Sequence, residues 1–344
     1  MASVRQWLEG ARLRTLPASA SPVVAGTAVA WFSATQAGPP WVEGHLLKAV
    51  ILLCLTVIVA LGFQIGCNFA NDYSDGVRGT DDNRVGPMRL VGSGAAQPPE
   101  VKRAAWICFA IACGAGIFVV ALAIGFFEPT WQFSSLTSGG WGVPAGLVLI
   151  GLACVLAAWF YTGGRRPYGY AGLGELFVFI FFGLVATVGT VFVQAPLVAQ
   201  KVEIAVGCVP TFRDIHWPAA LCMGIIMGCF STAILVANNL RDLPKDAEAG
   251  KNTLAVRIGD RSTRFLYTGL ILIGGVGIVI EAFLTSWFVL LGLIGIGLSI
   301  PLVVKVMGQA KGLELVSVLK STGIAQFVTA LLAGIGLALG WLYG

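Results

Sequence analysis

The chain has 344 residues, of which 57% are hydrophobic and only 11% are charged, and its mean hydropathy is +0.84. A soluble domain has about 25% charged residues, so this composition excludes a soluble enzyme and indicates a polytopic membrane protein. The net charge of +5 comes without a basic stripe interleaved with aromatic residues, which argues against nucleic acid as a partner.

Nine stretches are apolar enough to cross a bilayer as helices, because a hydrocarbon core of about 30 Å takes about 20 helical residues. They lie near residues 17–35, 49–71, 104–127, 143–162, 171–195, 217–240, 265–284, 286–305 and 321–343. Only a Thr285-Ser286 turn separates the seventh from the eighth. We therefore expect an all-α polytopic membrane protein, a single domain over residues 1–344 with nine transmembrane helices in a bundle.

The basic residues support this topology, because Lys and Arg mark cytoplasmic loops. With nine helices and a cytoplasmic N-terminus, 19 of the 22 basic residues fall on the cytoplasmic side. The exceptions are Lys48, Lys201 and Arg213. The pattern predicts a multi-pass protein of the cell membrane whose N-terminus and two Asp-rich segments face the cytoplasm.

The first Asp-rich segment continues the second predicted helix. Asn68, Asp72 and Asp75 are spaced three or four residues apart, so they share one helix face. A carboxylate at the centre of a membrane helix costs about 2.5–3.5 kcal/mol, so these side chains call for a function. Asp81 and Asp82 follow directly, and for them a solvated loop charge explains the sequence equally well.

A segment rich in Gly and Pro ends the fourth predicted helix, from Trp159 to Tyr170, and continues through Gly172-Leu173-Gly174-Glu175 into the fifth. Tyr161 is a candidate for a ring that faces an allylic cation through a cation–π contact. Tyr168 and Tyr170 are equally typical of an interfacial aromatic belt. Glu175 has entered an apolar helix and calls for a partner, for which an Arg of the same loop is the candidate.

The second Asp-rich segment ends the sixth predicted helix and repeats the spacing of the first. Asn238, Asp242 and Asp246 again lie four residues apart, and the pair Asn238/Asp242 matches Asn68/Asp72 at an offset of 170 residues. Four helices separate the two segments, so both have the same orientation. This weak internal repeat would place the two polar stripes face to face across the bundle.

Oxygen ligands without His or Cys favour Mg²⁺ or Mn²⁺ over Zn²⁺. Because Mg²⁺ usually binds one or two carboxylates together with substrate phosphates, two Asp stripes predict a diphosphate held between metal ions. Basic side chains close by can take the remaining phosphate charge. The candidates for substrate contacts are Arg78, Arg165, Arg241, Lys245 and Lys251, with the amides Asn68, Asn71 and Asn238.

With these residues, the chain resembles the UbiA-type superfamily of intramembrane aromatic prenyltransferases, and within it the 1,4-dihydroxy-2-naphthoate polyprenyltransferase branch of menaquinone biosynthesis. The resemblance is carried by Arg14-Thr15-Leu16-Pro17-Ala18-Ser19, Asn71-Asp72-Tyr73-Ser74-Asp75, Gly79-Thr80-Asp81, Tyr161-Thr162-Gly163-Gly164, Gly172-Leu173-Gly174-Glu175, Asn238-Asn239-Leu240-Arg241-Asp242, Asp246 and residues 250–257. Many members of the superfamily have a third Asp four residues after Asp75, where this chain has Gly79.

The resemblance implies a central cavity with cytoplasmic cap loops, Mg²⁺, a polyprenyl diphosphate reached through the membrane lipid, and 1,4-dihydroxy-2-naphthoate as acceptor. It implies loss of diphosphate and CO₂, giving demethylmenaquinone. The implied ligands of Mg²⁺–diphosphate are Asn68, Asp72, Asp75, Asp242 and Asp246. Catalytic roles then fall to the four Asp residues and Tyr161, and Arg14 is a candidate anchor for the acceptor carboxylate.

Other functions stay open at this point. Within the family, the acceptor could be 4-hydroxybenzoate or a porphyrin-derived ring. A cation-coupled transporter would also place Asp and Asn in helices, but near mid-helix breaks rather than at helix ends. A CDP-alcohol phosphotransferase would require Asp-Gly-x-x-Ala-Arg, whereas Asp75-Gly76 is followed by Val77-Arg78-Gly79-Thr80. No His lies in the motifs, so the residues identify no general base.

Overall fold

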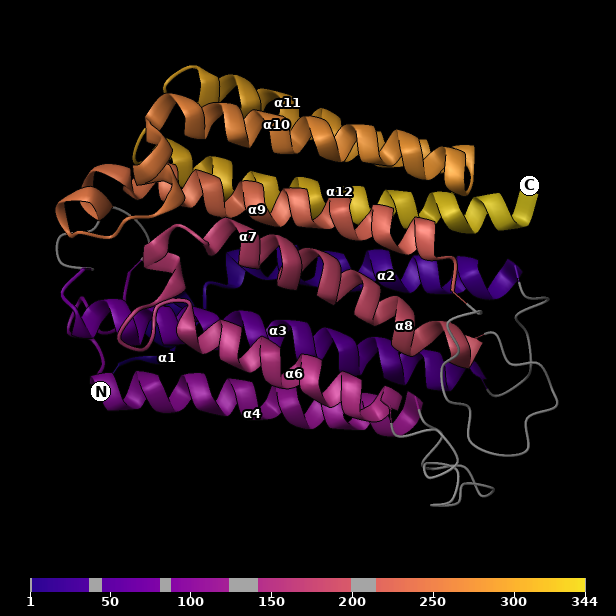
Figure 1. The fold of residues 1–344 in the computed structure, drawn as a ribbon, viewed down its shortest axis with the longest axis horizontal. Coiled ribbons are helices and arrows are strands. Elements are labelled where there is room, and N and C mark those ends of the chain that lie inside the picture. Colours follow the sequence, from indigo (N-terminus) through magenta and orange to yellow (C-terminus); the bar gives the residue numbers. More distant parts are fainter. Residues whose placement is uncertain (1, 37–44, 81–87, 124–141, 199–214, 344) are drawn as a thin grey trace.

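The computed structural model describes residues 2–36, 45–80, 88–123, 142–198 and 215–343, and all regular structure in these ranges is helical (Figure 1). The α-helices are α1 Val4–Ala11, α2 Leu16–Gln36, α3 His45–Val77, α4 Pro98–Ala123, α6 Gly142–Phe160, α7 Gly174–Val178, α8 Ala186–Val198, α9 Trp217–Glu248, α10 Leu254–Leu284, α11 Leu293–Met307 and α12 Leu313–Tyr343. A π-helical segment, Phe179–Val185, joins α7 to α8. Short 3₁₀ helices cover Leu13–Thr15, Tyr168–Ala171 and Trp287–Gly292.

The all-helical prediction is confirmed, and each of the nine predicted spans overlaps one helical rod, with residues 124–127 of the third span outside the described residues. Seven rods are long and apolar enough to cross a membrane. The apolar part of α6, Pro144–Phe160, is shorter, and α2 is not among the seven. The predicted boundary at Thr285 and Ser286 is also confirmed, because α10 ends at Leu284 and the next helix begins at Trp287.

Helices α3 and α9 continue past the ends of their predicted spans. The predicted spans end at residues 71 and 240, whereas α3 continues to Val77 and α9 to Glu248. Hydropathy marks where lipid contact ends, but a helix continues until its backbone is capped. Both helices end just before a glycine in the left-handed region, Gly79 with φ 74° and Gly250 with φ 71°. Both Asp-rich segments are therefore helical.

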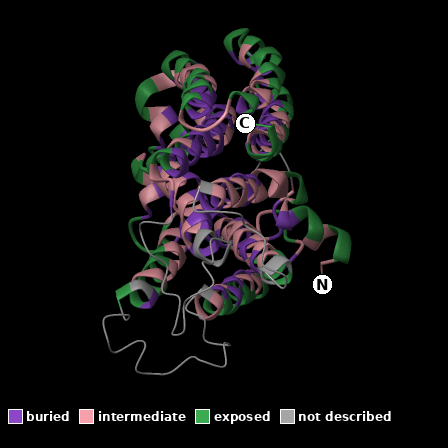
Figure 2. Cartoon of the chain, turned by 90° about the vertical axis from the view of Figure 1, so that its right-hand side faces the viewer, coloured by how far each residue is buried: buried purple, intermediate pink, exposed green. Residues whose placement is uncertain are grey.

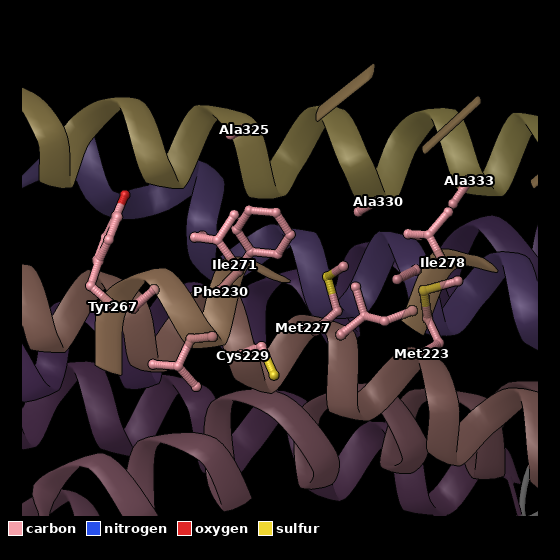
Figure 3. Close-up of a cluster of buried hydrophobic side chains, with 14 of the residues drawn as sticks. Met223, Met227, Cys229, Phe230, Tyr267, Ile271, Ile278, Ala325, Ala330 and Ala333 are labelled. Atoms are coloured by element: carbon pink, nitrogen blue, oxygen red, sulfur yellow. The ribbon is translucent and has the colours of Figure 1, made fainter. Parts of the chain in front are cut away.

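Helix α9 is the most enclosed rod, and it packs against α10, α12, α2 and the π-helical segment. Figure 3 shows Met223, Met227 and Phe230 of α9 in the core between α10 and α12. Small residues permit close helix contact in lipid. A Cβ atom added at Gly183 would lie 2.3 Å from the Gly228 Cα, so these two backbones touch. A second core forms between α1, α3 and α4.

The outer surface of the bundle is apolar. In a view along the rods, buried residues lie between the helices and exposed residues lie on the outside (Figure 2). Among the exposed side chains are Ile107, Ile111, Leu149, Leu272 and Ile300. Lipid tails are as apolar as these side chains, so such a surface is expected of an integral membrane protein.

The ends of α3 and α9 lie at the same end of the bundle, on the left in Figure 1, together with α1 and the start of α10. A cavity of about 350 Å³ lies at the opposite end, lined by Phe32, Thr35, Thr285, Ser286, Trp287, Phe288, Gly340 and Trp341. None of the predicted site residues lines that cavity. The chemistry predicted from the sequence therefore belongs to the end where α3 and α9 terminate, and the central cavity stays a prediction.

Candidate active site

Helix α3 ends in a Schellman cap. The Thr80 N–H donates to the Asp75 carbonyl at 3.1 Å, and the Gly79 N–H donates to the Gly76 carbonyl at 3.2 Å, which is the hydrogen-bond pair that defines this cap. The Thr80 hydroxyl also donates to the Asp75 carbonyl at 3.1 Å. The cap fixes Asp75 in the last turn of the helix.

Helix α9 ends in the same cap. The Lys251 N–H donates to the Asp246 carbonyl at 2.8 Å, and the Gly250 N–H donates to the Ala247 carbonyl at 3.2 Å. Asp246 thus has the same place in its cap as Asp75 has in the cap of α3, 171 residues earlier in the chain. The spacing Asp-x-x-x-Gly at both sites is a sequence signal for this repeat, although sequence reasoning treated Gly79 only as a departure from the family pattern.

Lys251 lies between the two carboxylates. Its Nζ is 3.7 Å from Asp75 Oδ2 and 3.9 Å from Asp246 Oδ1, and its side chain is only 15% exposed. Asp75 and Asp246 are themselves buried. The two Asp-rich segments therefore approach each other at one cationic position, through Asp75 and Asp246 rather than through the repeated pairs Asn68/Asp72 and Asn238/Asp242.

Tyr170 lies beside this position. Its hydroxyl donates to Asp75 Oδ1 at 2.8 Å and lies 3.2 Å from Thr80 Oγ1. The Lys251 Nζ lies 4.8 Å from the centre of its ring, and the Arg78 Cζ lies 5.3 Å from it. Burial, and then the negative charge of Asp75, raises the pKa of Tyr170, so its hydroxyl remains a donor at neutral pH.

Asp72 has different partners from Asp75. It is 1% exposed and accepts the backbone N–H groups of Leu90 at 2.8 Å and Val91 at 3.1 Å. The Arg12 guanidinium is close enough to interact with its charge. Asp72 therefore ties the segment that follows α3 to the helix.

Asp242 also differs from Asp246. Both of its oxygens accept from the Arg241 guanidinium, at 2.7 and 2.6 Å, and Arg241 also donates to Asn238 Oδ1 at 2.8 Å. Asn68 donates to the carbonyl of Ala11 at 3.0 Å, which holds α1 against α3. Among the described residues of the two predicted stripes, Asp75 and Asp246 form the ion pairs with Lys251. No group of three His, Cys, Asp or Glu side chains in the described ranges is placed to hold a metal ion.

The loop before α7 is fastened to the end of α3. Arg78 donates to the carbonyl oxygens of Thr162 and Gly164, and the Thr162 hydroxyl donates to Asn71 Oδ1 at 2.9 Å. Arg78 and Asn71, both predicted to contact substrate, thus position the loop that carries Tyr161. In this structure they make protein contacts close to the converging carboxylates.

Tyr161 and Tyr168 pack together in this loop, with ring centres 5.5 Å apart. The Tyr168 hydroxyl donates to the Ala157 carbonyl at 2.7 Å, and its ring stacks on Phe177 at 4.0 Å. Desolvation raises the pKa of both tyrosines. Glu175 is close enough to Tyr161 for its charge to contribute to that rise.

The predicted partner of Glu175 was wrong. Glu175 accepts from Asn239 Nδ2 at 2.9 Å, whereas the loop arginines Arg165 and Arg166 are exposed. The bond crosses between α7 and α9, and the pairing of two helices far apart in sequence could not be derived from loop composition. Asn239 therefore joins the site region as a residue that sequence reasoning missed.

Two of the remaining predicted residues lie on described elements, and two do not. Arg14 is exposed on the 3₁₀ helix after α1, and Lys245 is half-buried on α9. Asp81 and Asp82 lie outside the described residues. Arg12, predicted only as one of the cytoplasmic basic residues, is close enough to Asp72 for the two charges to interact.

The model of the UbiA prenyltransferase family matches residues 20–314. The chain belongs to this family. It is 43% identical over 99% of its length to a 1,4-dihydroxy-2-naphthoate octaprenyltransferase of Mycobacterium tuberculosis, and the match covers all of that protein. It is 34% identical to the enzyme of the same name in Escherichia coli, over 77% of this chain and 72% of that protein.

Solved structures of UbiA homologues share the fold. The apo homologue from Aeropyrum pernix aligns with a TM-score of 0.58 at 12% identity, over 92% of this UbiA-family chain and 97% of that one. The homologue from Archaeoglobus fulgidus bound to DMAPP and Mg²⁺ aligns with a TM-score of 0.51 at 13% identity, over 97% and 99%. At these identities the alignments establish the arrangement of helices.

Proposed function

We propose that this protein transfers a polyprenyl group from a polyprenyl diphosphate to 1,4-dihydroxy-2-naphthoate, with loss of diphosphate and CO₂. The product is demethylmenaquinone, formed as its hydroquinone. The choice of acceptor is supported by the 43% identity over the whole length of a 1,4-dihydroxy-2-naphthoate octaprenyltransferase. The converging Asp75 and Asp246 support the diphosphate half of the reaction, because they are carboxylates facing one cationic position.

The donor set fits Mg²⁺. The side chains offer carboxylate and amide oxygens, and two carboxylates are what Mg²⁺ usually takes from a protein when substrate phosphates supply the rest. Asp75 and Asp246 would hold the ion, with Asn68, Asp72 and Asp242 supplying further oxygens from the preceding turns. Mn²⁺ has the same ligand preference. When bound, the ion supplies Lewis-acid stabilisation of the diphosphate leaving group.

Basic and amide side chains around this position would bind the diphosphate. Lys251 already lies beside both carboxylates, and its ammonium would serve as a point charge for phosphate. Other basic side chains would add positive charge around the diphosphate, and amide side chains would donate hydrogen bonds to it. These further candidates are Arg78, Arg165, Lys245, Asn71 and Asn238.

Bond changes at the acceptor balance without an added base. The allylic C–O bond to diphosphate breaks, and the ring carbon that bears the carboxylate forms the new C–C bond. Loss of CO₂ leaves its electron pair in the ring and restores aromaticity. The Tyr161 ring would face the allylic cation, and Arg14 would bind the acceptor carboxylate before it leaves.

The test is a membrane assay with polyprenyl diphosphate and 1,4-dihydroxy-2-naphthoate labelled in its carboxyl group. We expect labelled CO₂ and a prenylated naphthohydroquinone in equal amounts, both abolished by chelation of divalent cations. 4-Hydroxybenzoate and a porphyrin-derived acceptor are run in parallel. Product with either of these and none with the naphthoate would contradict the proposed acceptor while keeping the prenyl transfer.

A further inference from the structure

The two capped helix ends meet at one side chain that belongs to neither Asp-rich segment. Tyr170 lies in the 3₁₀ helix Tyr168–Ala171 and contacts the residue after the cap glycine of each helix, Thr80 after α3 and Lys251 after α9. Its hydroxyl also donates to Asp75 Oδ1 at 2.8 Å. One tyrosine therefore touches a carboxylate, a hydroxyl and an ammonium of the candidate site.

We propose that Tyr170 is a positioning residue for the metal–diphosphate site: its hydroxyl orients the Asp75 carboxylate, and its ring holds the Lys251 ammonium beside it. The inference rests on the proposed function, in which Asp75 binds Mg²⁺ and Lys251 binds diphosphate. Hydrogen bonds to ligating carboxylates orient them for the metal, and losing one costs about 10- to 100-fold in metal affinity or activity.

The backbone holds Tyr170 in place independently of its hydroxyl. Gly172 ends the 3₁₀ helix in the left-handed region, with φ 73°. The Gly169 N–H donates to the Tyr161 carbonyl at 2.9 Å, and Arg78 binds two carbonyl oxygens earlier in the loop. Because the loop is held by these contacts, removal of the Tyr170 hydroxyl should leave the loop in place and change the setting of Asp75.

Tyr168 is a matched control in the same 3₁₀ helix. Its hydroxyl donates to the carbonyl of Ala157, and its ring stacks on Phe177. Like Tyr170, it thus combines a hydroxyl hydrogen bond with ring contacts, here to Phe177 and Tyr161. Tyr168→Phe removes a hydrogen bond of similar length from the same turn without touching either Asp-rich segment.

The first experiment measures the Tm of the purified full-length protein in detergent, as MgCl₂ is titrated at a fixed concentration of inorganic pyrophosphate. For Tyr170→Phe we expect the half-saturating Mg²⁺ concentration to rise about tenfold. For Tyr168→Phe we expect a lower Tm at every Mg²⁺ concentration and an unchanged half-saturation. Tyr170→Leu loses the same hydroxyl and should give the same Mg²⁺ shift, which keeps the test available if one variant does not fold.

The second experiment separates the hydroxyl from the ring by steady-state kinetics. The Mg²⁺ concentration for half-maximal prenyl transfer should rise in both Tyr170 variants, whereas the KM for polyprenyl diphosphate should change only in Tyr170→Leu. Loss of one cation–π contact predicts a rise in that KM of about threefold. A KM increase of equal size in Tyr170→Phe would contradict the role assigned to the ring.

Three results of the Tm titration would overturn the proposal: wild-type half-saturation in Tyr170→Phe, an equal shift in Tyr168→Phe, or no Mg²⁺ dependence of the wild-type Tm. The Tm titration contains neither acceptor nor prenyl chain. A wild-type protein that shows the Mg²⁺ dependence but does not prenylate the naphthoate would therefore contradict the proposed function and leave the result on Tyr170 standing.

Discussion

The ends of α3 and α9 share a backbone design and differ in the side chains that follow it. Both end in a Schellman cap with an Asp in the last turn and a left-handed glycine after it. The next residue is Thr80 on α3 and Lys251 on α9. Identical backbone geometry thus presents two carboxylates, Asp75 and Asp246, while only the α9 end supplies the charge that lies between them. The two ends are complementary rather than equivalent.

One turn earlier, the two helices differ in the partners of their Asp residues. Asp72 accepts two backbone N–H groups from the segment after α3, whereas Asp242 pairs with the neighbouring Arg241. Asp242 is thus engaged within its own motif, and Asp72 is engaged by the segment that follows its helix. We infer that the last Asp of each motif is the one whose charge is used between the motifs, and that the first Asp has a larger share in holding the local structure.

Neutralising either converging carboxylate should produce the largest effect. Asp75→Asn and Asp246→Asn keep the side-chain shape but remove the charge, so we expect activity to fall by more than about 100-fold. Initial rates in membranes at saturating Mg²⁺ measure this. Glu248→Gln, which removes an exposed acid two residues after Asp246, is the control and should keep the wild-type rate. A wild-type-like rate in either Asp variant would contradict the proposal that Asp75 and Asp246 together hold the metal ion.

Asp72→Asn should affect stability more than Asp75→Asn does. An amide has one acceptor oxygen, so one of the buried N–H groups of Leu90 and Val91 loses its partner, at a cost of about 1–3 kcal/mol. Thermal unfolding in detergent without Mg²⁺ compares the two variants directly. If Asp75→Asn lowers the Tm more than Asp72→Asn, the division of roles within the first motif is wrong.

Lys251→Met removes the charge that distinguishes the α9 end. Hydrogen bonds to charged groups contribute about 1.5–3 kcal/mol, so we expect the KM for polyprenyl diphosphate to rise at least about tenfold. Lys251→Arg retains the charge and should lie between the wild type and the Met variant. Lys311→Met, at an exposed position between α11 and α12, is the control. An unchanged KM in Lys251→Met would mean that the ammonium serves only to neutralise the two carboxylates.

Much of this arrangement could be predicted from the sequence, because apolar length determines helical rods in a membrane and four-residue spacing determines helix faces. Asp75 and Asp246 were placed in facing stripes on that basis, and they do converge. The sequence also carried an unused signal, since an Asp four residues before a glycine recurs at 75–79 and 246–250.

Contacts between distant segments could not be predicted in this way. Tyr170 reaches Asp75 across 95 positions of the chain, and Asn239 reaches Glu175 across 64. Spacing within a helix gives the face of a side chain but not the loop or helix that packs against it. The partners of Asp72 fall in the same class, because a backbone N–H group has no sequence signature.

The smallest expected effect tests whether the two caps are equivalent as backbone. Gly79→Ala and Gly250→Ala each force a left-handed residue to carry a Cβ atom, at a cost of about 1 kcal/mol. A Cβ atom at Gly250 meets no other atom within 4 Å, so its cost is conformational rather than steric.

Gly151→Ala, also in open space but inside helix α6, is the matched control and should raise the Tm, because alanine favours a helix by about 0.5–1 kcal/mol over glycine. Thermal unfolding of the three variants measures these shifts. Equal decreases in Tm for Gly79→Ala and Gly250→Ala would show that the two caps are equivalent as backbone. The functional difference between the two ends would then lie in Thr80 and Lys251. Unequal losses would instead place part of that difference in the backbone.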